Sequence, residues 1–73
     1  MNKYYFSINL SYERFLPFYQ GVVDTVQVVD DANRRIDLPA KHFRQYLTRD
    51  GIVGRFELIT QSDGKFIALN RIF

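Results

Sequence analysis

Apolar and polar residues alternate near the start of the chain. Phe6, Ile8 and Leu10 occupy every second position, with more polar residues between them. Successive side chains of a strand point to opposite faces of a sheet, so a period of two is typical of a strand with one buried face. We therefore expect residues 5–10 to form such a strand.

The period lengthens to three and four residues in the segment that follows. Ser11 is suited to cap the start of a helix, and apolar side chains then recur at helical spacing as far as Tyr19. Pro17 lies inside this segment and lacks a backbone N–H group, so the helix should be short or kinked. Gly21 is the residue type that commonly follows a helix C-terminus.

A hairpin is expected next. Residues 22–29 are rich in β-branched side chains, residues 30–33 read Asp-Asp-Ala-Asn, and residues 34–38 place Ile36 and Leu38 on one face. Asp and Asn side chains commonly bond neighbouring backbone N–H groups in turns. This order therefore indicates two strands joined by a turn.

The second half of the chain predicts another helix and another hairpin. Residues 40–47 follow a proline, which suits the start of a helix, and carry an apolar stripe at helical spacing. Residues 52–60 have the pattern of a long strand, a Ser-Asp-Gly turn follows at 62–64, and residues 65–72 form the final strand. Residues 66–69 are all apolar, so the pattern leaves open which face of the last strand is buried.

These elements give the order β-α-β-β-α-β-β. The two helices are too short to cover a sheet, so we expect an α+β fold whose small, mainly antiparallel sheet is curled into a roll or a partly open barrel. A chain of 73 residues has room for a single domain, residues 1–73.

Composition narrows the chemistry that this domain can perform. The chain contains no cysteine, which excludes disulfides and thiolate zinc sites. Seven Phe and five Tyr supply large apolar surfaces for a small core. The chain has no run of about 20 apolar residues and no signal-peptide pattern. We therefore expect a cytoplasmic protein that does not associate with membranes.

Positive charge is concentrated in the middle of the chain. The formal net charge is only +2, but residues 34–56 contain six cations and two acids. A tyrosine lies among these cations, and arginine together with aromatic rings suits phosphate pairing and base stacking. The plainer explanation is that the cations only solvate the surface of a small domain. The candidate binding residues are Arg34, Arg35, Lys41, Arg44, Tyr46, Arg49 and Arg55.

No catalytic motif is recognisable in the chain. His42 is the only histidine, and no serine lies in a Gly-x-Ser-x-Gly setting. Asp30, Asp31 and Asn33 could approach a cation, but a hairpin turn explains these residues without one. We therefore expect a protein that is not an enzyme and that holds no cofactor or metal ion.

Four segments of the chain together resemble a family of short uncharacterised bacterial proteins, domain-of-unknown-function family 2835. They are residues 5–8 (Tyr-Phe-Ser-Ile), 15–21, 36–40 (Ile-Asp-Leu-Pro-Ala) and 51–58 (Gly-Ile-Val-Gly-Arg-Phe-Glu-Leu). The resemblance covers essentially the whole chain. It implies a bacterial, cytoplasmic, single-domain protein, and it implies no activity, cofactor or catalytic residue.

Three hypotheses for function follow. The leading one is a small adaptor or binding module that engages another macromolecule, expected to be a protein, through its sheet and its basic residues. The first alternative is binding of RNA or single-stranded nucleic acid through the basic surface formed by residues 34–55. The second is a sensor of a small anionic ligand near Arg44 and Arg49. Association with further copies of the chain is left open.

Overall fold

The computed structural model describes residues 1–73, the whole chain, and contains both helix and strand. All strand pairs are antiparallel, so the α+β class with mainly antiparallel pairing is confirmed. The elements in chain order are β1 (Asn2–Leu10), α1 (Tyr12–Tyr19), β2 (Thr25–Val29), β3 (Arg35–Pro39), the 3₁₀ turns η1 (Ala40–His42) and η2 (Arg44–Tyr46), β4 (Ile52–Thr60) and β5 (Phe66–Arg71).

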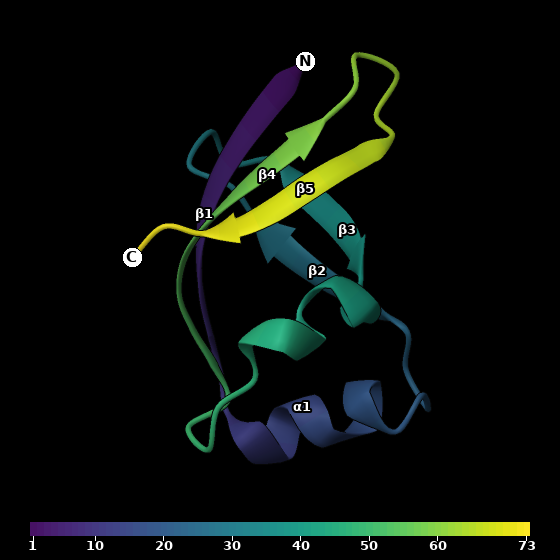
Figure 1. The fold of residues 1–73 in the computed structure, drawn as a ribbon, viewed down its shortest axis with the longest axis vertical. Coiled ribbons are helices and arrows are strands. Elements are labelled where there is room, and N and C mark those ends of the chain that lie inside the picture. Colours follow the sequence, from purple (N-terminus) through teal and green to yellow (C-terminus); the bar gives the residue numbers. More distant parts are fainter.

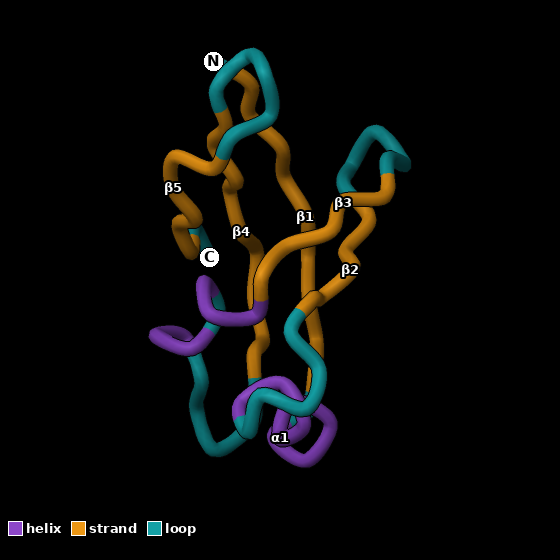
Figure 2. The backbone as a smooth tube through the Cα atoms, turned by 90° about the vertical axis from the view of Figure 1, so that its right-hand side faces the viewer, coloured by secondary structure: helices purple, strands orange, loops and turns teal.

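The strands are divided between two sheets and do not close into a barrel. The larger sheet has the order β1-β4-β5, and the β2–β3 hairpin forms a second sheet of two strands. The expectation of one curled sheet is therefore wrong in this respect. Figure 2 shows the β2–β3 hairpin on one side of the molecule and β5 on the other, with β1 and β4 between them.

β1 and β4 pair along their whole length, from Asn2 opposite Thr60 to Leu10 opposite Ile52. The strand predicted over residues 5–10 is therefore three residues longer at its start, because the nine-residue β4 offers pairing partners to all of β1.

The helix α1 begins and ends near the predicted positions. The Ser11 side chain accepts a hydrogen bond from the Arg14 backbone N–H, at 3.3 Å, which is the expected cap. The strand predicted over residues 22–29 starts only at Thr25. Val22 and Val23 are exposed instead, because their N–H groups bond the Pro17 carbonyl and so close the end of the helix.

The second short helix is present as two successive 3₁₀ turns. Their hydrogen bonds run from the Phe43 N–H to the Ala40 carbonyl and from the Tyr46 N–H to the Phe43 carbonyl. Phe43 lies at the junction and is completely buried. A single regular helix is interrupted here because burying this ring takes precedence over helical geometry, and 3₁₀ turns are typical of such short connections.

Aromatic rings fill the core between the two sheets. Phe6 and Phe56 lie opposite each other on β1 and β4 with ring centroids 5.8 Å apart, and Phe43 meets both rings edge-on. Phe15 carries the buried face of α1, which covers one end of the core (Figure 1). Each ring buries about 150–250 Å², so a few rings account for much of the small core of this chain.

A β-bulge decides which face of the final strand is buried. Ile59 pairs with Ala68, but Thr60 pairs with Phe66, so Ile67 is an extra residue without a partner. Leu69 is buried opposite Leu58, and the bulge places Phe66 opposite the buried Thr60, where Phe66 itself stays partly exposed. The bulge at Ile67 interrupts the alternation of faces, which fits the unbroken apolar run of residues 66–69.

Gly51 fixes the approach of the β4 start to the β1–α1 junction. Its φ is +98°, and an added Cβ would lie 2.6 Å from the Ser11 carbonyl carbon and 2.7 Å from the Tyr12 nitrogen.

We predict that Gly51→Ala lowers the free energy of unfolding by more than about 3 kcal/mol, because the backbone must move to make room for the added methyl group. The matched control is Gly64→Ala, at φ +93° with open space around it, which should cost about 1–2 kcal/mol. Urea unfolding measures both, and equal losses would contradict the steric explanation.

Candidate binding groove

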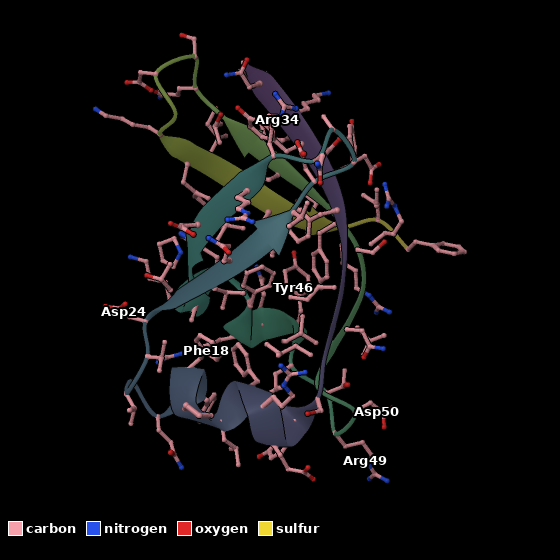
Figure 3. The ribbon with its side chains drawn as sticks, turned by 180° about the vertical axis from the view of Figure 1, so that it is seen from behind. Phe18, Asp24, Arg34, Tyr46, Arg49 and Asp50 are labelled. Carbon is pink, nitrogen blue, oxygen red and sulfur yellow. The ribbon has the colours of Figure 1, made fainter.

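The predicted basic residues do not form one patch. Figure 3 places Arg34 and Arg49 toward opposite ends of the long axis, along which the molecule extends 33 Å. Arg34 lies beside the β2–β3 turn, and Arg49 lies in the turn that precedes β4. Between them in sequence, Arg35 shares a hollow with Arg34, and Lys41 and Arg44 share a different one.

Arg34 is engaged in holding the β2–β3 turn. Its Nε lies 2.9 Å from Oδ2 of Asp30, whose side chain is only 2% exposed. The other carboxylate oxygen of Asp30 accepts hydrogen bonds from the Ala32 and Arg34 backbone N–H groups. The Arg34 guanidinium also lies 4.7 Å from the ring centroid of Tyr4. These contacts give the arginine a structural role at this turn.

Arg55 is paired with a second carboxylate of the same turn. Its Nη1 lies 3.1 Å from Oδ1 of Asp31 and 3.1 Å from the Ser7 hydroxyl, and its Nη2 bonds the other Asp31 oxygen. The hydrogen bonds from Arg55 lower the pKa of Asp31. Asp31 therefore neutralises the charge of Arg55, one of the predicted binding residues.

Lys41 and Arg44 line a small hollow beside α1. The hollow has a volume of about 330 Å³ and is also lined by Asp24 and Phe18. Arg44 donates from Nη2 to the Tyr19 carbonyl, at 3.2 Å, and its guanidinium lies 5.5 Å from the centroid of the Tyr19 ring. The Asp24 carboxylate offsets part of the positive charge, so the hollow is not a strong anion site.

Tyr46 faces the interior and is not placed to stack on a nucleic-acid base (Figure 3). Its ring meets Phe56 edge-on at 5.1 Å between centroids. Its hydroxyl donates a hydrogen bond of 2.6 Å to the Leu69 carbonyl of β5. Of the predicted binding residues, Arg35 alone lies in a large hollow without an ion-pair partner.

That hollow is a groove between β3 and the β4–β5 hairpin, with a volume of about 540 Å³. One wall is the chain from Arg34 to Pro39, and Gly64 and Phe66 lie across from it. The remaining lining residues are Tyr4, Leu58 and Thr60. The groove is therefore apolar at its floor and carries charges along its β3 wall.

The β3 wall presents unpaired main-chain groups. In the β2–β3 ladder, the Asp30 N–H bonds the Arg34 carbonyl and the Ala40 N–H bonds the Asp24 carbonyl. Alternate residues of an antiparallel strand direct their main-chain groups toward the partner strand and away from it. The N–H and C=O groups of Arg35 and Asp37 therefore point away from β2, as does the carbonyl of Pro39.

The edge of β5, in contrast, is covered. The same alternation directs the Leu69 carbonyl outward from β4, and it is this carbonyl that the Tyr46 hydroxyl bonds. The ring of His42 stacks on Phe66 with 3.7 Å between centroids and an angle of 7° between planes. The η1–η2 segment thus covers the β5 edge at Phe66 and Leu69 and leaves β3 as an open edge of the groove.

Burial, together with the charge of Lys41, lowers the pKa of His42. His42 is therefore neutral at pH 7, which suits a ring packed flat against Phe66. It has no carboxylate within ion-pair distance. The structure gives this histidine a packing role.

Sequence reasoning did not find the groove. Its lining combines Tyr4, Leu58, Thr60 and Phe66 with β3, and these four residues come from three further strands that only the tertiary arrangement brings together. One feature of the sequence does indicate the open edge of β3. Pro39 ends this strand, and proline within a sheet is typical of an edge strand.

No group of His, Cys, Asp and Glu residues is arranged to hold a metal ion. None of the helices combines the length and the apolar character that a membrane span needs.

Comparison with known proteins gives one match. The model of a family described as "Protein of unknown function (DUF2835)" matches residues 2–72. The chain belongs to this family. The resemblance inferred from the sequence is thereby confirmed. No curated protein matches the chain, and no solved structure matches it.

The pair of Arg55 and Asp31 gives a pH-dependent prediction. Because the pKa of Asp31 is lowered in the folded state, the pair stabilises the fold above about pH 4, the ordinary pKa of an aspartate, and this stabilisation is lost as the pH falls through the lowered pKa. We expect Asp31→Asn to be less stable than the wild type at pH 7 and to approach it at low pH.

Urea unfolding midpoints between pH 7 and pH 2 would measure this convergence. The matched control is Asp63→Asn, because the Asp63 carboxylate accepts a hydrogen bond only from the Lys65 backbone N–H. A difference between wild type and Asp31→Asn that stays constant over the whole pH range would show that the ion pair does not act in this way.

Proposed function

We propose that this protein is a non-enzymatic binding module that takes up an extended segment of a protein partner in the groove between β3 and the β4–β5 hairpin. The observation that carries the proposal is the open edge of β3 beside an apolar groove. An extended segment adds to such an edge through main-chain hydrogen bonds, and side-chain contacts in the groove supply specificity.

The groove matches the needs of an added strand. Arg35 and Asp37 each present one N–H donor and one C=O acceptor, which are the groups that antiparallel pairing uses. Ile36 and Leu38 direct their side chains toward the groove floor with Leu58 and Phe66. Every second side chain of an added strand would point to this floor, so alternating apolar residues are the expected pattern in the partner.

The basic residues have a secondary part in this proposal. Arg34 and Arg55 are paired with Asp30 and Asp31, so they add little net charge to the surface. Arg35 belongs to the β3 wall of the groove, and its side chain is exposed. The proposal therefore keeps the predicted protein partner and moves its contact from a basic surface to a strand edge.

A proline at the open edge tests the proposal. Asp37→Pro removes one outward N–H while leaving the hydrogen bonds between β3 and β2 intact, and edge strands accept proline at such positions. We would select peptides from a random display library on the folded domain and follow their binding by amide chemical shifts. We expect the amides of Arg35 and Asp37 to shift, and Asp37→Pro to weaken binding on the order of tenfold, since the bound segment loses a hydrogen bond and meets a ring.

The matched control is Asp37→Ala, which keeps the N–H group and removes only the carboxylate that accepts from Gln27. It should retain peptide binding within a few-fold. If selected peptides bind equally well to Asp37→Pro, or shift amides only outside the groove, the proposal is wrong.

Binding of RNA or single-stranded DNA is the main competing outcome. A nucleic acid that used four or five of the predicted cations would bind with a log–log salt slope of about −3 to −4. We expect a smaller slope and weak binding, because two of the six cations are paired with carboxylates and Arg49 lies at the opposite end of the molecule from Arg34. Titration with mixed-sequence RNA at two salt concentrations would decide, and a steep slope with shifts confined to residues 34–55 would favour the nucleic-acid hypothesis.

A further inference from the structure

The open edge of β3 carries a short charge pattern that is complementary to itself. Arg35, Ile36 and Asp37 follow one another, so a cation and an anion flank a central apolar residue. Arg35 makes no ion pair, and the Asp37 carboxylate accepts only from the neutral amide of Gln27, at 3.2 Å. Both charges lie on the outer face of the hairpin, where both residues are exposed.

Antiparallel pairing of two such edges would bring opposite charges together. If a two-fold axis passes through Ile36, then Arg35 of each copy lies opposite Asp37 of the other copy. These are also the two residues whose N–H and C=O groups point away from β2, so each pair exchanges two main-chain hydrogen bonds. The Ile36 residues meet at the axis, as the central pair.

We propose that the occupant of the β3 edge, in the absence of another partner, is β3 of a second copy of this chain. The two hairpins then form one continuous four-stranded antiparallel sheet. This inference rests on the same open edge as the proposed function. Dimerisation and partner binding then compete, because the dimer occludes the groove and a partner segment must displace the second copy.

The chemistry favours the antiparallel, isologous arrangement over other ways of joining two copies. Cross-strand pairs of opposite charge stabilise a sheet and like charges directly opposite destabilise it, so a shift of register by two residues would lose both favourable pairs. A strand added at the edge of β5 would meet Tyr46 at the Leu69 carbonyl and His42 at the Phe66 ring, and β3 has no such obstruction. A pair of β3 strands is thus the arrangement that the exposed groups specify.

Charge-reversal variants provide the test. Arg35→Asp places two acids at these positions and Asp37→Arg places two cations there, so each variant alone meets like charges in its own dimer. An equimolar mixture of the two variants restores both opposite-charge pairs. We would measure association by sedimentation equilibrium and by the concentration dependence of the Arg35–Asp37 amide shifts, at protein concentrations up to about 1 mM, since a short interface binds weakly.

We expect reversible dimerisation of the wild type, dimers about tenfold weaker for each single variant, and recovery to near wild-type affinity in the mixture. High salt should reduce the recovery, because exposed charge pairs are screened. The matched control is Arg49→Asp, which makes the same change of charge at the other end of the molecule and should leave association unchanged (Figure 3).

A wild type that remains monomeric at the highest concentration would overturn the inference. So would a mixture that associates no better than either variant alone. Both results are independent of the proposed function, which stands if selected peptides still bind the wild type and lose affinity for Asp37→Pro. Conversely, dimerisation without any peptide binding would leave the inference in place and remove the proposed function.

Discussion

The packing of Phe56 against its neighbours is the interaction on which the rest of the fold depends. β4 is the central strand of its sheet, and Phe56 at its middle contacts the rings of Phe6, Phe43 and Tyr46. These rings come from β1 and from the 3₁₀ segment, so one side chain ties the sheet to the connection that crosses it. In a chain of 73 residues there is little other apolar surface that could replace this cluster.

Because Phe43 and Tyr46 must reach Phe56, the connection between β3 and β4 is drawn across the edge of β5. This placement brings the Tyr46 hydroxyl to the Leu69 carbonyl and the His42 ring to Phe66. Core packing therefore places side chains over part of the β5 edge. The outer edge of β3, the strand from which the connection begins, stays free. The groove follows from how the core is filled.

Much of the local structure could be predicted from the sequence, because it is set by nearest neighbours. The alternation around Phe6, the Ser11 cap and the Asp30–Asn33 turn each act within a few residues, and the structure contains all three. The division into two sheets, the bulge at Ile67 and the groove depend on contacts between distant segments, which a one-dimensional pattern does not specify. For the same reason the basic residues, adjacent in sequence, were expected to act together. The structure instead pairs Arg34 and Arg55 with acids of one turn and sends Arg49 to the other end.

The cover that η1 and η2 place over β5 also limits how far a sheet can grow. The edge of β5 is obstructed at the Leu69 carbonyl by the Tyr46 hydroxyl, whereas no such contact covers the outward main-chain groups of β3. A strand added at β3 completes that edge and creates no new one on the same molecule. An edge strand whose main-chain groups are covered is a poor template for pairing with another chain. The Tyr46 hydroxyl, which core packing brings to this position, thus also limits where another strand can add to the sheet of β1, β4 and β5.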